Sequence, residues 1–204
     1  MHDYLIDGPE SAKLTFAFAH GAGAPMDSDW MNMVAKAVAD KGFRVVRFEF
    51  PYMAERRTTG KKKPPNPQRI LEATWHEVID DLGADTLVIG GKSMGGRMAS
   101  LVADDAKVRG LICLGYPFHP PGKPEKLRTE HLAALKTPTL ICQGERDPFG
   151  TKDEVPGYTL SKKIQINWAP DGDHGLKPRK KSGYTEEQNI AAAVEAMAAF
   201  MGKL

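Results

Sequence analysis

A glycine-rich stretch, VIGGKSMGG at residues 88–96, contains two motifs that would support different chemistry. Its Gly-Lys-Ser matches the end of a phosphate-binding loop, whereas Gly91-Lys92-Ser93-Met94-Gly95 matches G-x-S-x-G, a turn that presents a serine nucleophile. A phosphate-binding loop needs four residues between two glycines, so that backbone N–H groups form a wide cradle. Here apolar residues lead directly from Leu87 to Gly90. The sequence therefore favours a nucleophilic Ser93 over a nucleotide site.

A nucleophilic serine needs a histidine base and an acid that orients the histidine. In folds that use this turn, the three residues follow in the order serine, acid, histidine. Asp147 lies in QGERDPFG and His174 lies in APDGDHG, each directly after an apolar run. Asp171 and Asp173 are alternative acids, but they are too close to His174 in the sequence to orient its ring easily. We predict a triad of Ser93, Asp147 and His174.

Serine chemistry also needs two backbone N–H donors, which stabilise the negatively charged oxygen of the intermediate. The residue after the nucleophile supplies one donor, and a loop after an early strand supplies the other. Met94 is the first candidate, and Ala22, or else Gly23, in the stretch HGAG is the second. His20 in the same stretch is expected to brace the backbone.

Two more side chains are candidates for contact with a substrate. Lys92 lies inside the serine turn, and His119 follows the apolar run that ends at Leu114. The stretch DGDH at residues 171–174 offers oxygen and nitrogen ligands to a metal, but it lacks the D-x-[DN]-x-[DN]-G spacing of a calcium loop. We predict neither a metal nor a cofactor.

These candidates need a scaffold that brings strand ends together. Short apolar runs alternate with longer amphipathic stretches, which is typical of a parallel sheet covered by helices. Strands are expected at 14–19, 43–50, 86–90, 108–114, 139–142 and 163–168, and helices at about 29–41, 67–82, 94–105 and 186–201. In such sheets, sites form at the carboxyl ends of strands, where all three triad candidates fall. We predict a single α/β domain over residues 1–204, with a mostly parallel sheet of about six to seven strands flanked by helices.

Composition limits the class of protein. The chain has 204 residues, of which 41% are apolar, so it is long enough to bury a sizeable core. It has no apolar run of the length that spans a membrane and no signal-peptide profile at its start, so a cytoplasmic location is expected. Cys113 and Cys142 lie in apolar runs and are expected to be reduced core thiols.

Positive charge is concentrated in two segments, although the net charge is only +2. Residues 56–69 hold six basic side chains, residues 177–181 hold four, and neither segment holds an acid. The stretch RRTTGKKKPPNP at 56–67 is rich in Gly and Pro and is expected to be a loop. If both segments lie at the mouth of the site, they would attract an anionic substrate. Lysine loops that only aid solubility are the alternative.

Several motifs together resemble the α/β-hydrolase superfamily from about Leu14 to the C-terminus. They are HGAGAPMDSDWM, GGKSMGGRMA, GYPFHPPGKPEKLR, GERDPFG and GDHGLKPRK. They look more narrowly like a small group that includes testis-expressed hydrolase-like proteins and a regulatory subunit of a chromatin-acetylating complex. The resemblance implies the fold and the roles of Ser93, Asp147 and His174. The usual first two strands are absent or reduced to residues 4–6.

Only 21 residues, 117–137, are available where larger relatives insert a lid domain, so no lid is expected. An open site suits a short ester or thioester, and we predict a small-molecule substrate that a serine hydrolase cleaves through an acyl-enzyme. An interaction scaffold on a catalytically retired fold is one alternative, although it predicts a broken triad. Binding of an anionic polymer is another, but the basic segments lack the interleaved aromatic residues that stack on single-stranded nucleic acid.

Overall fold

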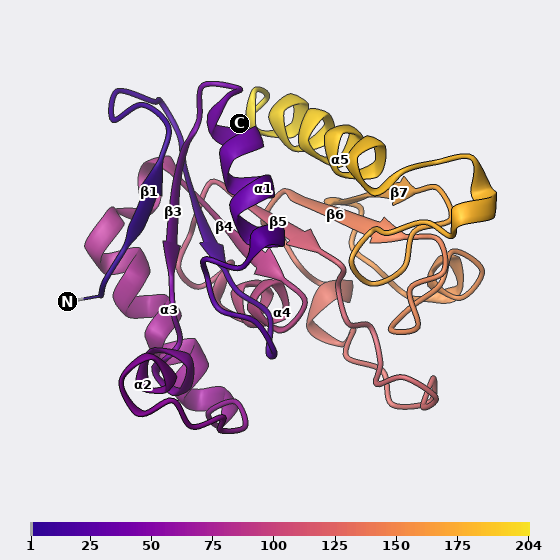
Figure 1. Ribbon diagram of the computed structural model, residues 1–204, viewed down its shortest axis with the longest axis horizontal. Helices are drawn as coiled ribbons and strands as arrows, with labels where there is room; N and C mark the ends of the chain where they lie inside the picture. Colours follow the sequence, from indigo (N-terminus) through magenta and orange to yellow (C-terminus); the bar gives the residue numbers. More distant parts are fainter. Residues whose placement is uncertain (1) are drawn as a thin grey trace.

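The computed structural model describes residues 2–204, which build one seven-stranded sheet with the order β1-β3-β2-β4-β5-β6-β7 (Figure 1). The strands are β1 Leu5–Asp7, β2 Thr15–Ala19, β3 Arg44–Phe48, β4 Leu87–Lys92, β5 Gly110–Leu114, β6 Thr139–Gly144 and β7 Ile164–Ala169. β1 pairs with β3 in antiparallel orientation, and all other neighbouring strands are parallel. The mostly parallel α/β sheet predicted from the sequence is confirmed, and the short first strand lies within one residue of its expected position.

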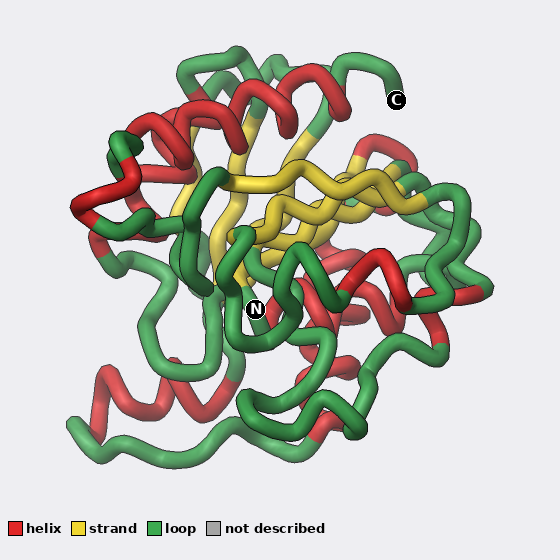
Figure 2. Tube along the Cα trace, turned by 90° about the vertical axis from the view of Figure 1, so that its right-hand side faces the viewer, coloured by secondary structure: helices red, strands yellow, loops and turns green. Residues whose placement is uncertain are grey.

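Helices cover both faces of the sheet (Figure 2). The helices are α1 Asp29–Ala39, α2 Pro51–Thr59, α3 Gln68–Leu82, α4 Met94–Val102 and α5 Glu186–Met201. Successive side chains of a strand point to opposite faces, so Ala17 and Ala19 pack with α2, α3 and α4, whereas Phe16 and Phe18 pack with α1 and α5. Because both faces are covered, the central strands are almost entirely buried and apolar.

Large side chains fix α3 and α4 against the sheet next to the serine turn. Trp75 of α3 is fully buried and packs edge-on against Phe48, with 4.8 Å between the ring centroids. Its indole Nε1 donates a hydrogen bond of 3.3 Å to the carbonyl oxygen of Gly95 in α4. The start of α4 is therefore held from the side as well as by the strand before it.

One expectation about the basic segment 56–67 is wrong. Residues 56–59 are not a loop, because they form the last turn of α2. Pro51 is at the first position of this helix, where its missing N–H costs nothing, and Gly60 ends the helix in a left-handed conformation with φ 67°. Within the basic segment 56–67, the residues from Gly60 to Pro67 are irregular.

The connection between β5 and β6 contains no lid domain, as expected. Within residues 115–138, the regular structure is a single 3₁₀ turn at His131–Ala133. Cys113 and Cys142 are free and buried, and burial raises the pKa of Cys142 to about 12. Among residues 2–204, no helix is both long and apolar enough to cross a bilayer.

Candidate active site

Ser93 lies at the sharp turn between β4 and α4. Its φ of 51° and ψ of −114° place it in a strained conformation that non-glycine residues rarely adopt. Its N–H donates to the carbonyl oxygen of Leu114 at 3.0 Å, which ties the turn to the end of β5. A Cβ at Gly91 would lie 2.5 Å from the Ala19 oxygen, and one at Gly95 would lie 2.5 Å from the His20 oxygen. Both glycines of G-x-S-x-G are therefore needed for the close approach of this turn to β2.

His174 and Asp147 form a direct pair. The Nδ1 atom of His174 lies 2.8 Å from Oδ2 of Asp147, whose side chain is completely buried. Gln143 Nε2 donates to the same Oδ2 at 2.9 Å, and the Phe149 N–H donates to Oδ1 at 2.9 Å. A carboxylate only accepts hydrogen bonds, so Nδ1 of His174 carries the proton and Nε2 presents a lone pair. The Phe149 ring packs on the imidazole with 4.3 Å between centroids.

The other acids near His174 have different partners. Asp171 forms ion pairs with Arg146 and Arg179, and Asp173 Oδ1 accepts the N–H groups of Gly175 and Lys177. Asp147 is thus the carboxylate that contacts the His174 ring. Within residues 2–204, no cluster of three metal-ligating side chains is present.

Ser93 and His174 line one pocket of about 350 Å³. Small residues of the HGAG loop form one wall, and larger side chains form the other; the lining is Gly21, Ala22, Gly23, Ala24, Ser28, Trp30, Met31, Lys92, Ser93, Phe149 and His174. In the described chain, no direct hydrogen bond joins Ser93 to His174. The pocket is open and mostly apolar, so it can hold a small acyl group beside the serine hydroxyl.

The HGAG loop is braced so that its backbone faces this pocket. His20 is fully buried, its Nδ1 donates to the Gly21 oxygen at 2.7 Å and its Nε2 accepts the Phe50 N–H at 3.1 Å. The Tyr52 hydroxyl donates to the Ala22 oxygen at 3.0 Å. The Met94 N–H is the first of α4 and therefore has no acceptor within the helix. This arrangement leaves Met94 and Ala22, with Gly23 beside it, as candidate donors.

Lys92, which the sequence suggested as a substrate contact, lines the Ser93 pocket and also contacts the His174 turn. Its ammonium donates to the His174 carbonyl oxygen and lies 5.3 Å from the centre of the Trp30 ring. Trp30 Nε1 in turn donates to the Gly175 oxygen at 3.0 Å. Burial lowers the pKa of Lys92 to about 8, although the charges of Asp147 and Asp173 favour its protonated form. Lys92 and Trp30 thus both bind the backbone of the turn that carries His174, and we call this pair the Lys92–Trp30 clasp.

His119 is a correction to the sequence analysis, because it does not line the pocket. It is buried, its Nδ1 donates to the Pro120 oxygen at 2.9 Å, and its Nε2 faces Glu154 at 3.6 Å. A further serine–histidine contact joins Ser100 Oγ to His131 Nε2 at 2.8 Å. Ser100 is buried and already donates its proton to the Arg97 oxygen at 2.7 Å, so this contact is structural.

The basic segments carry less free charge than the sequence suggested. Arg57 pairs with Asp27 and Glu49, and Lys63 pairs with Glu55. In the second segment, Lys177 pairs with Glu186 and Arg179 with Asp171. None of the ten basic side chains lines the Ser93 pocket.

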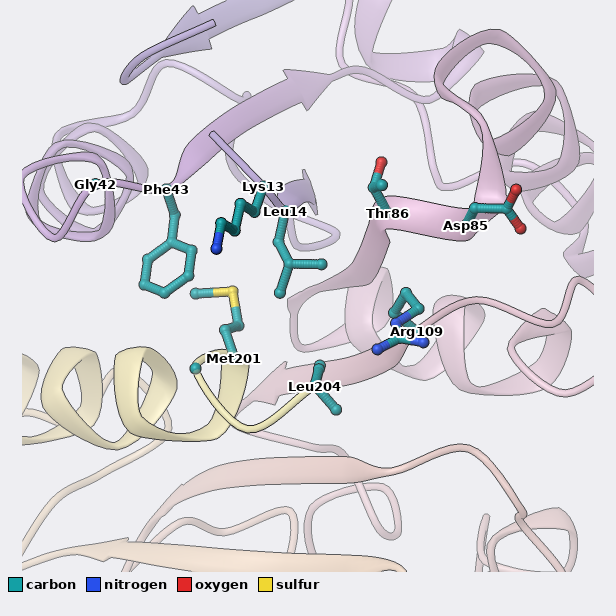
Figure 3. A pocket seen from close by; sticks show the side chains of 10 residues that line it. Lys13, Leu14, Gly42, Phe43, Asp85, Thr86, Arg109, Met201 and Leu204 are labelled. Atoms are coloured by element: carbon teal, nitrogen blue, oxygen red, sulfur yellow. The ribbon is translucent and has the colours of Figure 1, made fainter. Parts of the chain in front are cut away.

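A larger hollow lies at the opposite, amino edge of the sheet (Figure 3). It measures about 470 Å³ and is lined by residues that begin β2 to β5 and by the end of the chain, among them Lys13, Phe43, Thr86, Arg109 and Leu204. Its lining holds no serine, cysteine or histidine. The chemistry of a nucleophile and base therefore belongs to the smaller pocket.

Gln143 and Phe149 are site residues that the sequence analysis missed. Gln143 is fully buried between β5 and the acid loop: its Oε1 accepts the Tyr116 N–H at 2.7 Å while its Nε2 reaches Asp147. Its position four residues before Asp147 is a weak signal in the sequence. The contact of Trp30 with Gly175 spans 145 residues and leaves no local signal.

Comparison with known proteins agrees with this geometry. A sequence profile described as an alpha/beta hydrolase domain matches residues 12–202. The chain is 26% identical over 148 residues to a putative protein-lysine deacylase, ABHD14B, of Rattus norvegicus; the match covers 70% of this chain and 66% of the relative, slightly less than two thirds of its length.

Solved structures resemble the chain over nearly its whole length. A dienelactone hydrolase from Anabaena variabilis has a TM-score of 0.74 at 19% identity, with 98% of this chain and 90% of that chain covered. An alpha-beta serine hydrolase homologue from Coxiella burnetii has a TM-score of 0.65 at 21% identity, with the same coverage of 98% and 90%. A serine hydrolase without a lid from Xanthomonas campestris has a TM-score of 0.60 at 23% identity, with 85% and 80% covered. At these identities the likeness concerns the fold.

Proposed function

The chain belongs to the α/β-hydrolase family, and from this premise we propose that it is a serine hydrolase with the triad Ser93, His174 and Asp147. The observation that carries the proposal is the 2.8 Å pair of His174 and Asp147, whose imidazole opens onto the same pocket as Ser93. The smaller group with the testis-expressed and chromatin-complex proteins is part of this proposal. We also propose that residues 1–204 form a single catalytic domain and that the protein acts in the cytoplasm.

In the proposed reaction, Ser93 Oγ attacks the acyl carbon while His174 Nε2 takes its proton. Asp147 holds the ring with its proton on Nδ1 and stabilises the imidazolium that forms. The N–H groups of Met94 and Ala22, or else Gly23, stabilise the oxyanion. His174 then gives the proton to the leaving group, and water releases the acyl group by the reverse sequence of proton transfers. Ser93 and His174 must approach for this step, and a bound substrate brings such contacts to hydrogen-bonding length.

The pocket favours a short acyl chain. Its volume of about 350 Å³ and the absence of a lid suit small esters and thioesters better than long lipids. The relative ABHD14B is described as a putative protein-lysine deacylase, so an acylated lysine amide is the second substrate class to test. A panel of acetyl to octanoyl p-nitrophenyl esters, an acetyl thioester and an acetyl-lysine peptide separates these classes. We expect kcat/KM to peak at the shortest esters.

The decisive experiment is labelling with a fluorophosphonate probe. The native chain should be labelled, and Ser93→Ala and His174→Ala should not be, with a loss of roughly 10⁶ in kcat for either change. Ser100→Ala is the matched control, because its hydroxyl takes no part and labelling should persist. A native chain that resists the probe would favour the alternative, an interaction scaffold on a retired hydrolase fold.

A preference for anionic substrates is a separate part of the proposal. Some cations at 56–69 and 177–181 form no ion pair among residues 2–204, namely Lys61, Lys62, Lys180 and Lys181, and they would raise the local concentration of an anion. Salt screens such attraction. As the salt concentration rises from about 0.02 M to about 0.5 M, kcat/KM for a carboxylate-bearing ester should therefore fall, while kcat/KM for a neutral ester should stay constant. Equal salt dependence would refute this preference and leave the triad untouched.

A further inference from the structure

A second cluster of charged side chains lies where α4 faces the segment after β5. It surrounds a hollow of about 450 Å³ that is lined by two arginines, a histidine, a glutamate and two leucines: Arg97, Leu101, Leu127, Arg128, Glu130 and His131. The hollow shares no lining residue with the Ser93 pocket. The proposed hydrolysis gives none of these side chains a role.

The two arginines line one hollow together and are among the six of the ten arginines in residues 2–204 that form no ion pair with a carboxylate. Four arginines of the described chain form ion pairs with carboxylates: Arg47, Arg57, Arg146 and Arg179. Arg97 and Arg128 form none within residues 2–204. The guanidinium of Arg97 donates from Nη2 to Gln68 Oε1 at 3.2 Å, a neutral partner, and its Nε is buried without any partner. Buried polar groups are normally satisfied, so this guanidinium has bonding capacity left for a ligand.

The segment that carries Arg128 is firmly held. The Arg128 N–H donates to the Phe118 oxygen at 2.7 Å, and its own carbonyl accepts the Tyr116 hydroxyl at 2.9 Å. His131 is fixed by its contact with Ser100. The arginines therefore face the hollow from two anchored elements, α4 and the segment after β5, and need no large rearrangement to meet a ligand.

Each guanidinium also raises the energy of the other. Burial and the charge of Arg97 lower the pKa of Arg128, and the same two causes lower the pKa of His131. Two cations held together without a counter-charge repel each other, and an anion placed between them removes that repulsion. Arginine suits this task because its N–H groups match the oxygens of phosphate.

We propose that this hollow binds a small phosphate monoester, whose phosphate contacts Arg97 and Arg128 and whose short apolar chain contacts Leu101 and Leu127. The leucines supply the apolar part of the lining, and Leu127 is 49% exposed in the free chain. Glu130 is the one acid in the lining and opposes the anion, so the two arginines leave a net charge of +1 when His131 is neutral. The site lies outside the catalytic pocket and does not depend on the proposed hydrolysis.

Isothermal titration of butyl phosphate into the full chain tests the proposal at constant ionic strength. Arg97→Gln and Arg128→Gln should each weaken binding about tenfold or more, because each removes a charged hydrogen bond. Glu130→Gln should tighten binding several-fold by removing a like charge. Arg109→Gln should change nothing, because it removes an exposed arginine at the opposite edge of the sheet. Inorganic phosphate should bind several-fold more weakly than butyl phosphate if the leucines contact the chain.

Two controls separate this site from the serine pocket and from misfolding. Ser93→Ala should bind butyl phosphate as the native chain does, and thermal melting should show that each arginine variant is folded. If one arginine variant unfolds, the other and Glu130→Gln still decide the matter. Absence of saturable binding to the native chain, or equal binding by the native chain and the folded arginine variants, would overturn the proposal.

Discussion

Replacement of Lys92 by methionine should stabilise the fold and weaken catalysis. Methionine keeps the length and apolar stem of the lysine but removes its charge. The pKa of Lys92 falls from 10.5 to about 8 because burial disfavours the ammonium. Such a shift corresponds to about 3 kcal/mol at neutral pH. The side chain is only partly buried by surface area, so solvent screening reduces the gain that we expect to about 1 to 2 kcal/mol.

The stabilising effect of Lys92→Met declines with rising pH in a defined window. Below about pH 8, Lys92 is charged in both the folded and the unfolded chain, and the full penalty acts on the fold. Between about pH 8 and the unfolded value of 10.5, the folded chain binds fewer protons than the unfolded chain, so the native protein gains stability. The advantage of Lys92→Met should therefore be largest at pH 7 and vanish near pH 10.5.

Catalysis should move in the opposite direction. The variant loses the bond from the ammonium to the His174 carbonyl and the contact with the Trp30 ring, so the Lys92–Trp30 clasp opens. A misplaced catalytic group can lose about 10²-fold in rate, so we expect a roughly 10- to 100-fold lower kcat if this bond holds the His174 imidazole in place. KM should change little, because the Lys92 ammonium donates its hydrogen bond to the His174 backbone and not to the substrate. In the native chain, kcat should also decline above about pH 8, where Lys92 loses its charge, and the variant should lack that decline.

Urea unfolding at pH 7 and pH 10, together with ester kinetics, measures both effects. Lys36→Met is the matched control, since Lys36 is exposed on α1 and pairs only with Asp40 at 2.8 Å; it should leave stability and kcat nearly unchanged. A Lys92→Met chain that is less stable at pH 7 and retains its kcat would show that the charge is a structural support rather than a positioning group.

Three more changes test neighbouring parts of the structure. Asp147→Asn should lower kcat about 10⁴-fold with little change in melting temperature, because it disturbs the proton position on His174; a loss under tenfold in ester kinetics would contradict its role. Gly144→Ala places a Cβ 2.2 Å from the Asp173 oxygen, so activity should fall as the His174 turn shifts; an unchanged pH profile and kcat would show that the turn tolerates it. Trp75→Ala should lower the free energy of unfolding by about 3 to 5 kcal/mol in urea, because this fully buried ring packs between Phe48 and α4. A loss under about 1 kcal/mol would mean that neighbouring side chains move to fill the cavity.

The strands, and the positions of Ser93, Asp147 and His174 after strand ends, could be predicted because their signals are local. Apolar runs mark the strands, and the residues that follow them fall at one edge of a parallel sheet. Helix α2 was not predicted, although Pro51 at its start and Gly60 at its end are local signals for a helix. The glycine and the prolines at residues 60–67 favoured a loop for the whole basic stretch. The position of His119 could not be predicted, since Glu154 and Phe149 reach it from a distant loop.

The Lys92–Trp30 clasp shows why pairings far apart in sequence remain hidden. Lys92 lies 82 residues from His174, and its environment is created by three strand ends that meet only in the fold. The same holds for charge: the sequence places ten cations in two segments, but Asp27, Glu49 and Asp171 lie elsewhere in the chain and neutralise several of them. Counts of charge along a chain therefore overstate the field at a site.

Backbone contact, more than side-chain contact, fixes the distance between the parts of the candidate site. A Cβ at Gly91 would meet β2, one at Gly144 would meet the His174 turn, and one at Gly115 would lie 2.7 Å from the Lys92 Nζ and 2.8 Å from the His174 oxygen. Chain segments without side chains at these points can approach until they touch, and sheet hydrogen bonds then hold them there. The proposed triad residues, Ser93, Asp147 and His174, lie near these close backbone approaches. Small shifts of the backbone should therefore affect catalysis more than changes in the surrounding pocket wall, which only shape the acyl group.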